Sequence, residues 1–146
     1  MLYFSAIYGK KVLSKDGKYL GKLLDLLFLP LEIPIITKFV IKTEHNKKII
    51  LPIQLLRNYN EYFALKAHDY KTEKRTEKEA SVRKDLQDKQ IIDLKGQKVI
   101  RANDVVIQEN PAYAISGIDI GVFGVFRWIG VAKFIAKILR NFSIQY

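Results

Sequence analysis

Residues 9–28 have the sequence GKKVLSKDGKYLGKLLDLLF, and residues 88–107 have the sequence DKQIIDLKGQKVIRANDVVI. The two stretches align without a gap, and both place a glycine where a tight turn needs a positive φ. Their shared order of strand, glycine turn, long strand and aspartate predicts two copies of one small β unit. Ile36–Thr43 extends the match by aligning with Ala114–Gly121, after a shift of one position. The identical pairs are Lys10/Lys89, Gly17/Gly96 and Asp25/Asp104, and the matched apolar pairs are Val12/Ile91, Leu13/Ile92, Leu20/Val99, Leu26/Val105, Leu27/Val106 and Phe28/Ile107.

Short apolar runs separated by turn signals surround these stretches. Such runs at regular spacing predict a mainly β fold made of small barrels or sandwiches. Within the third run, Phe39 and Ile41 are expected on one face and Val40 on the other. The predicted strands cover residues 12–13, 19–29, 35–43, 49–52 and 62–65 in the first unit, and 91–92, 99–107 and 112–120 in the second.

The segment between the two units is dense in charge. Thr76-Glu77-Lys78-Glu79 matches a capping box, and Val82 and Leu86 lie on one helical face. This pattern predicts a helix over about Glu77–Gln87. The expected organisation is a first unit at residues 1–70, a charged helical linker at 71–89 and a second unit at 90–146.

Residues 127–142 show helical periodicity, with a wide apolar stripe and a basic opposite face. This amphipathic helix has three open placements: over its own barrel, against a second copy or a downstream domain, or on an anionic membrane surface. The helix takes the place of the first unit's fourth strand, so the missing strand is expected beyond residue 146 or from another chain. The candidate partner-binding residues are Arg127, Trp128, Val131, Lys133, Phe134, Lys137, Ile138 and Arg140.

Composition narrows the function class. The 146 residues are 49% hydrophobic and 27% charged, as in a globular protein, and they contain no cysteine. Disulfides, cysteine-bound metal centres and thiol nucleophiles are therefore excluded, and a cytoplasmic location is expected, with a membrane-proximal one left open. The net charge of +10 is concentrated in residues 1–65 and 121–146. A basic surface of this kind suits nucleic acid, an anionic membrane or an acidic partner, although scattered lysines also serve solubility.

No residue pattern indicates catalysis. Asp25 and Asp104 occupy equivalent positions, either as ligand carboxylates or as acceptors of backbone amides at a turn. The second interpretation is favoured, because a hard cation needs several oxygens together. Residues 15–18 are expected to form a hairpin turn rather than a phosphate loop, and His45 and His68 lie far apart in the sequence. We therefore expect a non-enzymatic protein with no catalytic residues, metal site or cofactor.

The pattern G-x-x-V-x-x-x-D-G-x-x-L-G-K-L-x-D-L at Gly9–Leu26 resembles the opening of a PRC-barrel domain. Residues 86–107 and 117–130 resemble the second barrel of a bacterial family. In that family, tandem PRC-barrel units precede a domain like the N-terminal region of MgtE-type magnesium transporters, sometimes with CBS domains. The resemblance implies two small PRC-type β-barrel units in tandem. The family's acidic magnesium-sensing helical domain and its Pro-Trp strand are absent from this sequence, so magnesium binding is not carried over.

The sequence thus predicts a non-catalytic adaptor or regulatory module. Its expected partner is another protein or a downstream domain of the same polypeptide, docked through edge strands and the apolar helix, with lysines shaping the encounter. A homodimer stays open. One alternative is an RNA-binding module in ribosome assembly, similar to the PRC-barrel of the ribosome maturation factor RimM. Another is a membrane-surface module of a magnesium-transporter-like protein.

Overall fold

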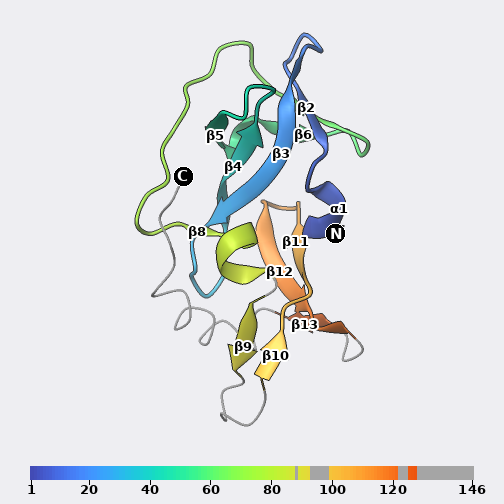
Figure 1. Ribbon diagram of the computed structural model, residues 1–146, viewed down its shortest axis with the longest axis vertical. Coiled ribbons are helices and arrows are strands. Elements are labelled where there is room, and N and C mark those ends of the chain that lie inside the picture. The colour runs from blue at the N-terminus through green and yellow to red at the C-terminus, as the bar shows by residue number, and fades with distance from the viewer. Residues whose placement is uncertain (88, 93–98, 122–124, 128–146) are drawn as a thin grey trace.

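A computed structural model describes residues 1–87, 89–92, 99–121 and 125–127 (Figure 1). The fold is mainly β, as predicted, with only short helical segments in the described ranges. In chain order the elements are β1 (Leu2–Tyr3), α1 (Phe4–Ile7), β2 (Lys11–Leu13), β3 (Tyr19–Phe28), β4 (Ile36–Lys42), β5 (Lys48–Pro52), the 3₁₀ turn η1 (Ile53–Leu55), β6 (Leu56–Asn58), β7 (Phe63–Leu65), β8 (Ala80–Ser81), the π-helical turn η2 (Val82–Leu86), β9 (Gln90–Ile92), β10 (Val99–Arg101), β11 (Asp104–Gln108), β12 (Ala114–Asp119) and β13 (Val125–Arg127).

The larger sheet has the strand order β5-β4-β3-β2-β7-β6. The long strand β3 organises it: β3 pairs with β4 along one edge, and with β2 and then β8 along the other. Among the described residues no ladder joins β5 to β6, so the sheet is open there. The predicted strands of the first half are all present, and β1 and β6 are additional ones.

The second half repeats the hydrogen-bonding register of the first. Leu26 pairs with Phe39 in the β3–β4 hairpin, and Val105 pairs with Ile118 in the β11–β12 hairpin. Both hairpins also shift register at the same place, after Leu27 and after its counterpart Val106. The alignment of the two halves continues without a shift through these hairpins, so the expected match of Ile36 with Ala114 is wrong. Phe28 pairs with Ile36, and Ile107 pairs with Ile115, which is the true counterpart of Ile36.

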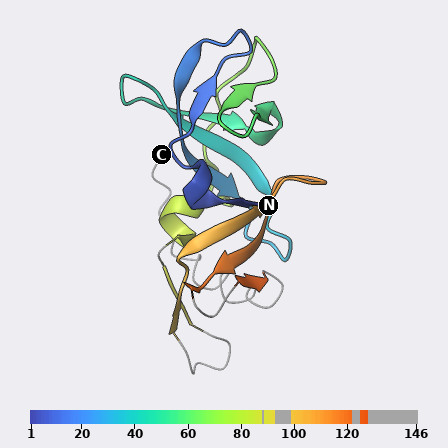
Figure 2. The same cartoon turned by 90° about the vertical axis from the view of Figure 1, so that its right-hand side faces the viewer.

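Two short segments cross between the halves. The strand β1 opens the chain but pairs with β11 of the second half, where Tyr3 lies opposite Val106. The strand β8 leads into the second half but pairs with β3 of the first, where Ser81 lies opposite Leu27. Figure 2 shows the N-terminus beside the orange strand of the second half. Strand β1 of the first half therefore completes an edge of the second half, and strand β8 of the linker completes an edge of the first.

One hydrophobic core spans both halves. Phe4, Phe28 and Phe39 belong to the same buried cluster as Val105 and Ile118. A smaller cluster on the opposite face of the larger sheet contains Leu24, Leu27, Val40 and Ile50. The predicted alternation in β4 is thus confirmed, because Phe39 and Ile41 lie in the main core and Val40 in the outer cluster.

The predicted linker helix over Glu77–Gln87 is wrong. Only Val82–Leu86 is helical, because Ala80 and Ser81 are drawn into the sheet as β8 and are buried there. Half of the expected capping box forms: Glu79 Oε1 accepts a hydrogen bond from the Thr76 amide at 2.9 Å, but this contact closes a turn. The actual N-cap is Ser81, whose Oγ accepts from the Lys84 amide at 3.0 Å.

The strand β13 lies where the amphipathic helix was expected to begin. Its residue Arg127 pairs with Gly117 of β12, so the prediction that Arg127 begins the helix is wrong. Because β13 flanks β12 as β5 flanks β4, the second half does have a strand at this position. The rest of the predicted helix, residues 128–142, lies outside the described residues.

Candidate functional site

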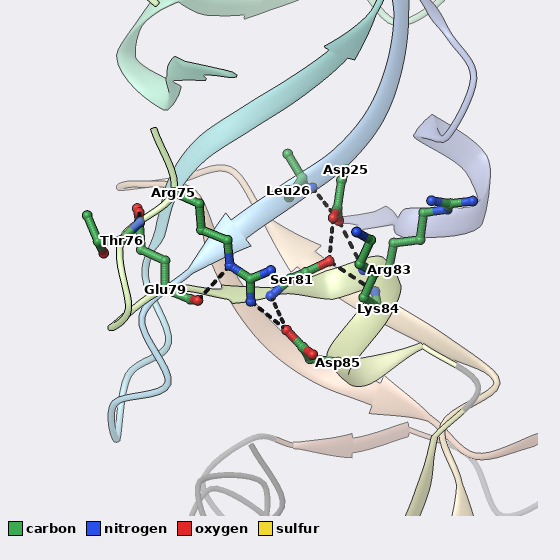
Figure 3. A network of polar contacts seen from close by, with 9 residues as sticks. All are labelled: Asp25, Leu26, Arg75, Thr76, Glu79, Ser81, Arg83, Lys84 and Asp85. Carbon is green, nitrogen blue, oxygen red and sulfur yellow. Dashed lines mark hydrogen bonds and ion pairs between the residues drawn. The ribbon is translucent and has the colours of Figure 1, made fainter. Parts of the chain in front are cut away.

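Asp25 lies fully buried on β3 and accepts hydrogen bonds from the segment that crosses over from the linker (Figure 3). Its Oδ1 accepts from the amides of Leu26 at 2.7 Å and Arg83 at 3.0 Å. Its Oδ2 accepts from the Ser81 hydroxyl. The carboxylate therefore fixes the start of η2 against β3.

Asp104 holds the other crossing segment in the same way. Its Oδ1 accepts from the amides of Val105 at 2.8 Å and Ser5 at 3.0 Å, and its Oδ2 accepts from the Ser5 hydroxyl. The favoured interpretation of the two aspartates, as acceptors of backbone amides, is confirmed. Within the described ranges, no three His, Cys, Asp or Glu side chains gather closely enough to hold a metal ion.

A buried ion pair anchors the linker to the outer face of the larger sheet. Lys38 Nζ lies 2.6 Å from Glu79 Oε1 and donates to the Lys74 carbonyl at 3.0 Å. Burial alone would raise the pKa of Glu79, but hydrogen bonds from Lys38, Thr37 and the Thr76 amide outweigh burial and hold that pKa below its ordinary value of 4.5. Sequence reasoning missed this pair, because its members are 41 residues apart.

A second ion pair fastens the linker to η2. Arg75 donates to the Asp85 carboxylate at 2.9 Å and to the Glu79 carbonyl at 3.0 Å, and Asp85 also accepts from the Ser81 amide at 2.7 Å (Figure 3). Arg75 and Asp85 are almost completely buried. These contacts give the buried charged groups structural partners, so this network serves the fold rather than a ligand.

The polar turn at residues 14–18 is a hairpin, as predicted. The Ser14 amide donates to the Lys18 carbonyl at 2.7 Å, and Gly17 has a φ of +86°, which a side chain would strain. Next to it, His68 Nδ1 lies 3.2 Å from Asp16, with both side chains exposed. His45 instead borders a separate open pocket of about 240 Å³, whose lining is mostly apolar. The structure does not bring the two histidines into one site.

The β3–β4 loop presents an exposed apolar surface. Leu31, Ile33 and Ile35 are 56%, 65% and 43% exposed. Backbone bonds hold this loop: the Leu29 amide donates to the Ile35 carbonyl at 2.9 Å, and the Ile115 amide donates to the Pro34 carbonyl at 2.9 Å. The backbone of this apolar loop is therefore held in place by hydrogen bonds while its aliphatic side chains remain exposed. Sequence reasoning read the segment only as a break between strands.

Of the eight predicted partner-binding residues, the structure describes only Arg127, in β13. The seven others, which run from Trp128 to Arg140, lie outside the described residues. In the part of the chain that is described, no helix has the length and apolar character required to cross a membrane.

The sequence matches no protein-family model, and a search of curated proteins also finds no match.

Proposed function

We propose that this chain is a non-catalytic binding module of the PRC-barrel type, with two barrel-like units that each complete the other. In this proposal the apolar β3–β4 loop docks a protein partner, which is another polypeptide or a downstream domain of the same one. The rest of the predicted amphipathic helix, residues 128–142, adds to the same interface in this proposal. The resemblance of Gly9–Leu26 to the PRC-barrel opening and the repeated register support the fold assignment.

The exposed apolar loop carries the proposal. In the alignment that places Leu26 over Val105, Leu31 corresponds to Asn110, Ile33 to Ala112 and Ile35 to Ala114. The same loop position in the second half is therefore polar or small. Exposed aliphatic side chains on a backbone that is held by hydrogen bonds favour a protein contact. Their burial against a partner would be favourable by about 25 cal/mol per Å² of apolar surface.

Site-specific photocrosslinking in the source cells tests the proposal. A benzophenone amino acid at position 33 should give a discrete crosslinked product with a protein partner, or with a downstream domain of the same polypeptide. The same amino acid at position 112, on the equivalent loop of the second half, should give none. Equal products from both positions would contradict a specific docking loop. Crosslinks that join only two copies of this chain would replace the adaptor by a homodimer.

A further inference from the structure

Four lysines lie in register across four neighbouring strands of the larger sheet. Lys11 on β2 pairs with Lys22 on β3, Lys22 pairs with Lys42 on β4, and Lys42 pairs with Lys48 on β5. All four side chains are exposed. Because residues in register on adjacent strands face the same side, the four form one row. With strands about 4.8 Å apart, this lysine row is about 14 Å long.

The lysine row is costly for the sheet, because like charges directly opposite each other destabilise strand pairing. Lys11, Lys22 and Lys42 have no ion pair among the described residues. The charge of the row also acts on Lys84 in η2. Burial lowers the pKa of Lys84, and the positive charge of Lys48, a member of the row, lowers it further, while the negative charge of Asp25 raises it. The fold therefore tolerates repulsion here.

The second half shows that the fold does not need a lysine at every position of the row. In the same alignment of the two halves, Lys11 corresponds to Gln90, Lys22 to Arg101 and Lys42 to Gly121. The first two positions pair in both halves, since Gln90 lies opposite Arg101 as Lys11 lies opposite Lys22. Two of these three positions are therefore uncharged in the second half, and only Arg101 stays basic. A role outside the fold explains the continuous row of lysines in the first half.

We infer that the lysine row binds the phosphate backbone of a nucleic-acid duplex without reading its sequence. A duplex strand carries one phosphate per 3.4 Å of axis, so a row of about 14 Å spans about four phosphates. Single-strand binding usually adds aromatic stacking, and this row contains no aromatic side chain. The neighbouring apolar residues on the same face, Leu24, Val40 and Ile50, are buried, which leaves no apolar surface there to enter a bilayer.

Fluorescence anisotropy with a short labelled DNA duplex and the full chain tests this inference. If four phosphates are neutralised, log K should fall with log[KCl] with a slope of about −3.6. The quadruple variant K11Q/K22Q/K42Q/K48Q should lose nearly all of that binding. A matched variant with the same charge change at four exposed lysines outside the row, K66Q/K71Q/K78Q/K89Q, should keep the wild-type slope.

A milder variant covers the case in which the quadruple variant does not fold. K22Q/K42Q removes the two central charges and should make the slope shallower by about 1.8. Its thermal midpoint should equal or exceed that of the wild type, because the substitution relieves repulsion. Binding by the row variants should fall while photocrosslinking at position 33 is unchanged, which separates this inference from the proposed function.

Three results would overturn the inference. One is no binding of the duplex at low salt. Another is an equal loss of binding in the row variant and the matched variant, because the effect would then follow net charge rather than the row. The third is row-dependent sedimentation with phosphatidylserine vesicles in the absence of duplex binding, which would assign the row to a membrane surface.

Discussion

The two halves of the molecule share their backbone pairing and differ in what they expose. Both have the same register and the same bulge, and both use an aspartate, Asp25 or Asp104, to hold a segment that crosses over from another part of the chain. The apolar loop and the lysine row occur only in the first half. What the halves share maintains the fold, so what only the first half carries is the better guide to binding.

A single glycine explains where the backbones of the halves diverge. A Cβ on Gly21 would lie 2.3 Å from the Lys42 carbonyl oxygen and 2.7 Å from the Ile41 Cγ2. The absence of that Cβ lets β3 run without a break past both β2 and β4. Ile100 occupies the equivalent position in the second half, where the chain instead forms two strands, β10 and β11.

The largest effect is expected from the ion pair that only the first half has. The counterpart of Lys38 is the uncharged Gly117, so Lys38→Met removes a charge that the second half lacks and leaves Glu79 buried without its counter-charge. We expect a loss of about 4 kcal/mol in the free energy of unfolding, measured by urea denaturation at pH 7. The double variant K38M/E79M should recover most of this loss. A loss below about 1 kcal/mol in K38M would show that the pair does not anchor the linker.

Substitution of the two equivalent aspartates, Asp25 and Asp104, tests the feature that both halves share. Asp25→Ala leaves the Ser81 hydroxyl and the Arg83 amide without their acceptor, and we expect a cost of about 3 kcal/mol in urea denaturation. Asp104→Ala should cost less, about 2 kcal/mol, because Asp104 is 9% exposed whereas Asp25 is fully buried. If Asp104→Ala were neutral, the two aspartates would not have equivalent roles.

Gly21→Ala should be destabilising by about 2 kcal/mol, because the added methyl group forces β4 away from β3. Amide hydrogen exchange should show the loss of protection concentrated at the paired residues Lys22 and Leu23 and their partners on β4. The β11–β12 hairpin should keep its protection. Uniform loss across both hairpins would mean that the glycine supports the whole core instead of one junction.

Local signals predicted much of this fold, and contacts between distant residues account for the failures. The Gly17 turn and the alternation around Val40 were predictable, because each depends on residues close together in the sequence. The shared register of the two hairpins was predictable from the match between residues 9–28 and 88–107. The crossing of β1 and β8 was not, since a two-residue strand has no detectable periodicity. The same crossing explains why the predicted helix does not include Ala80. Ala80 pairs with Phe28 in the sheet, and this pairing outweighs the helix signal of the nearby capping pattern. The lysine row emerges only when four strands are placed in register.

The smallest effect concerns acid stability, and it also distinguishes the halves. Hydrogen bonds that favour the ionised form lower the pKa of Glu79 in the folded state, despite burial, so the folded state binds a proton less readily than the unfolded state does. This contribution to stability is fully present above the unfolded pKa, near 4.5, and is lost as the pH falls through the lower folded value. Urea titrations between about pH 5 and pH 3 should therefore show that the free energy of unfolding declines less steeply for Glu79→Gln than for the wild type, with the two curves converging at the acid end.

The exposed neighbour Glu77 provides the control, and Glu77→Gln should follow the wild-type curve. Parallel curves for Glu79→Gln and the wild type would mean that the acid response arises in features common to both halves.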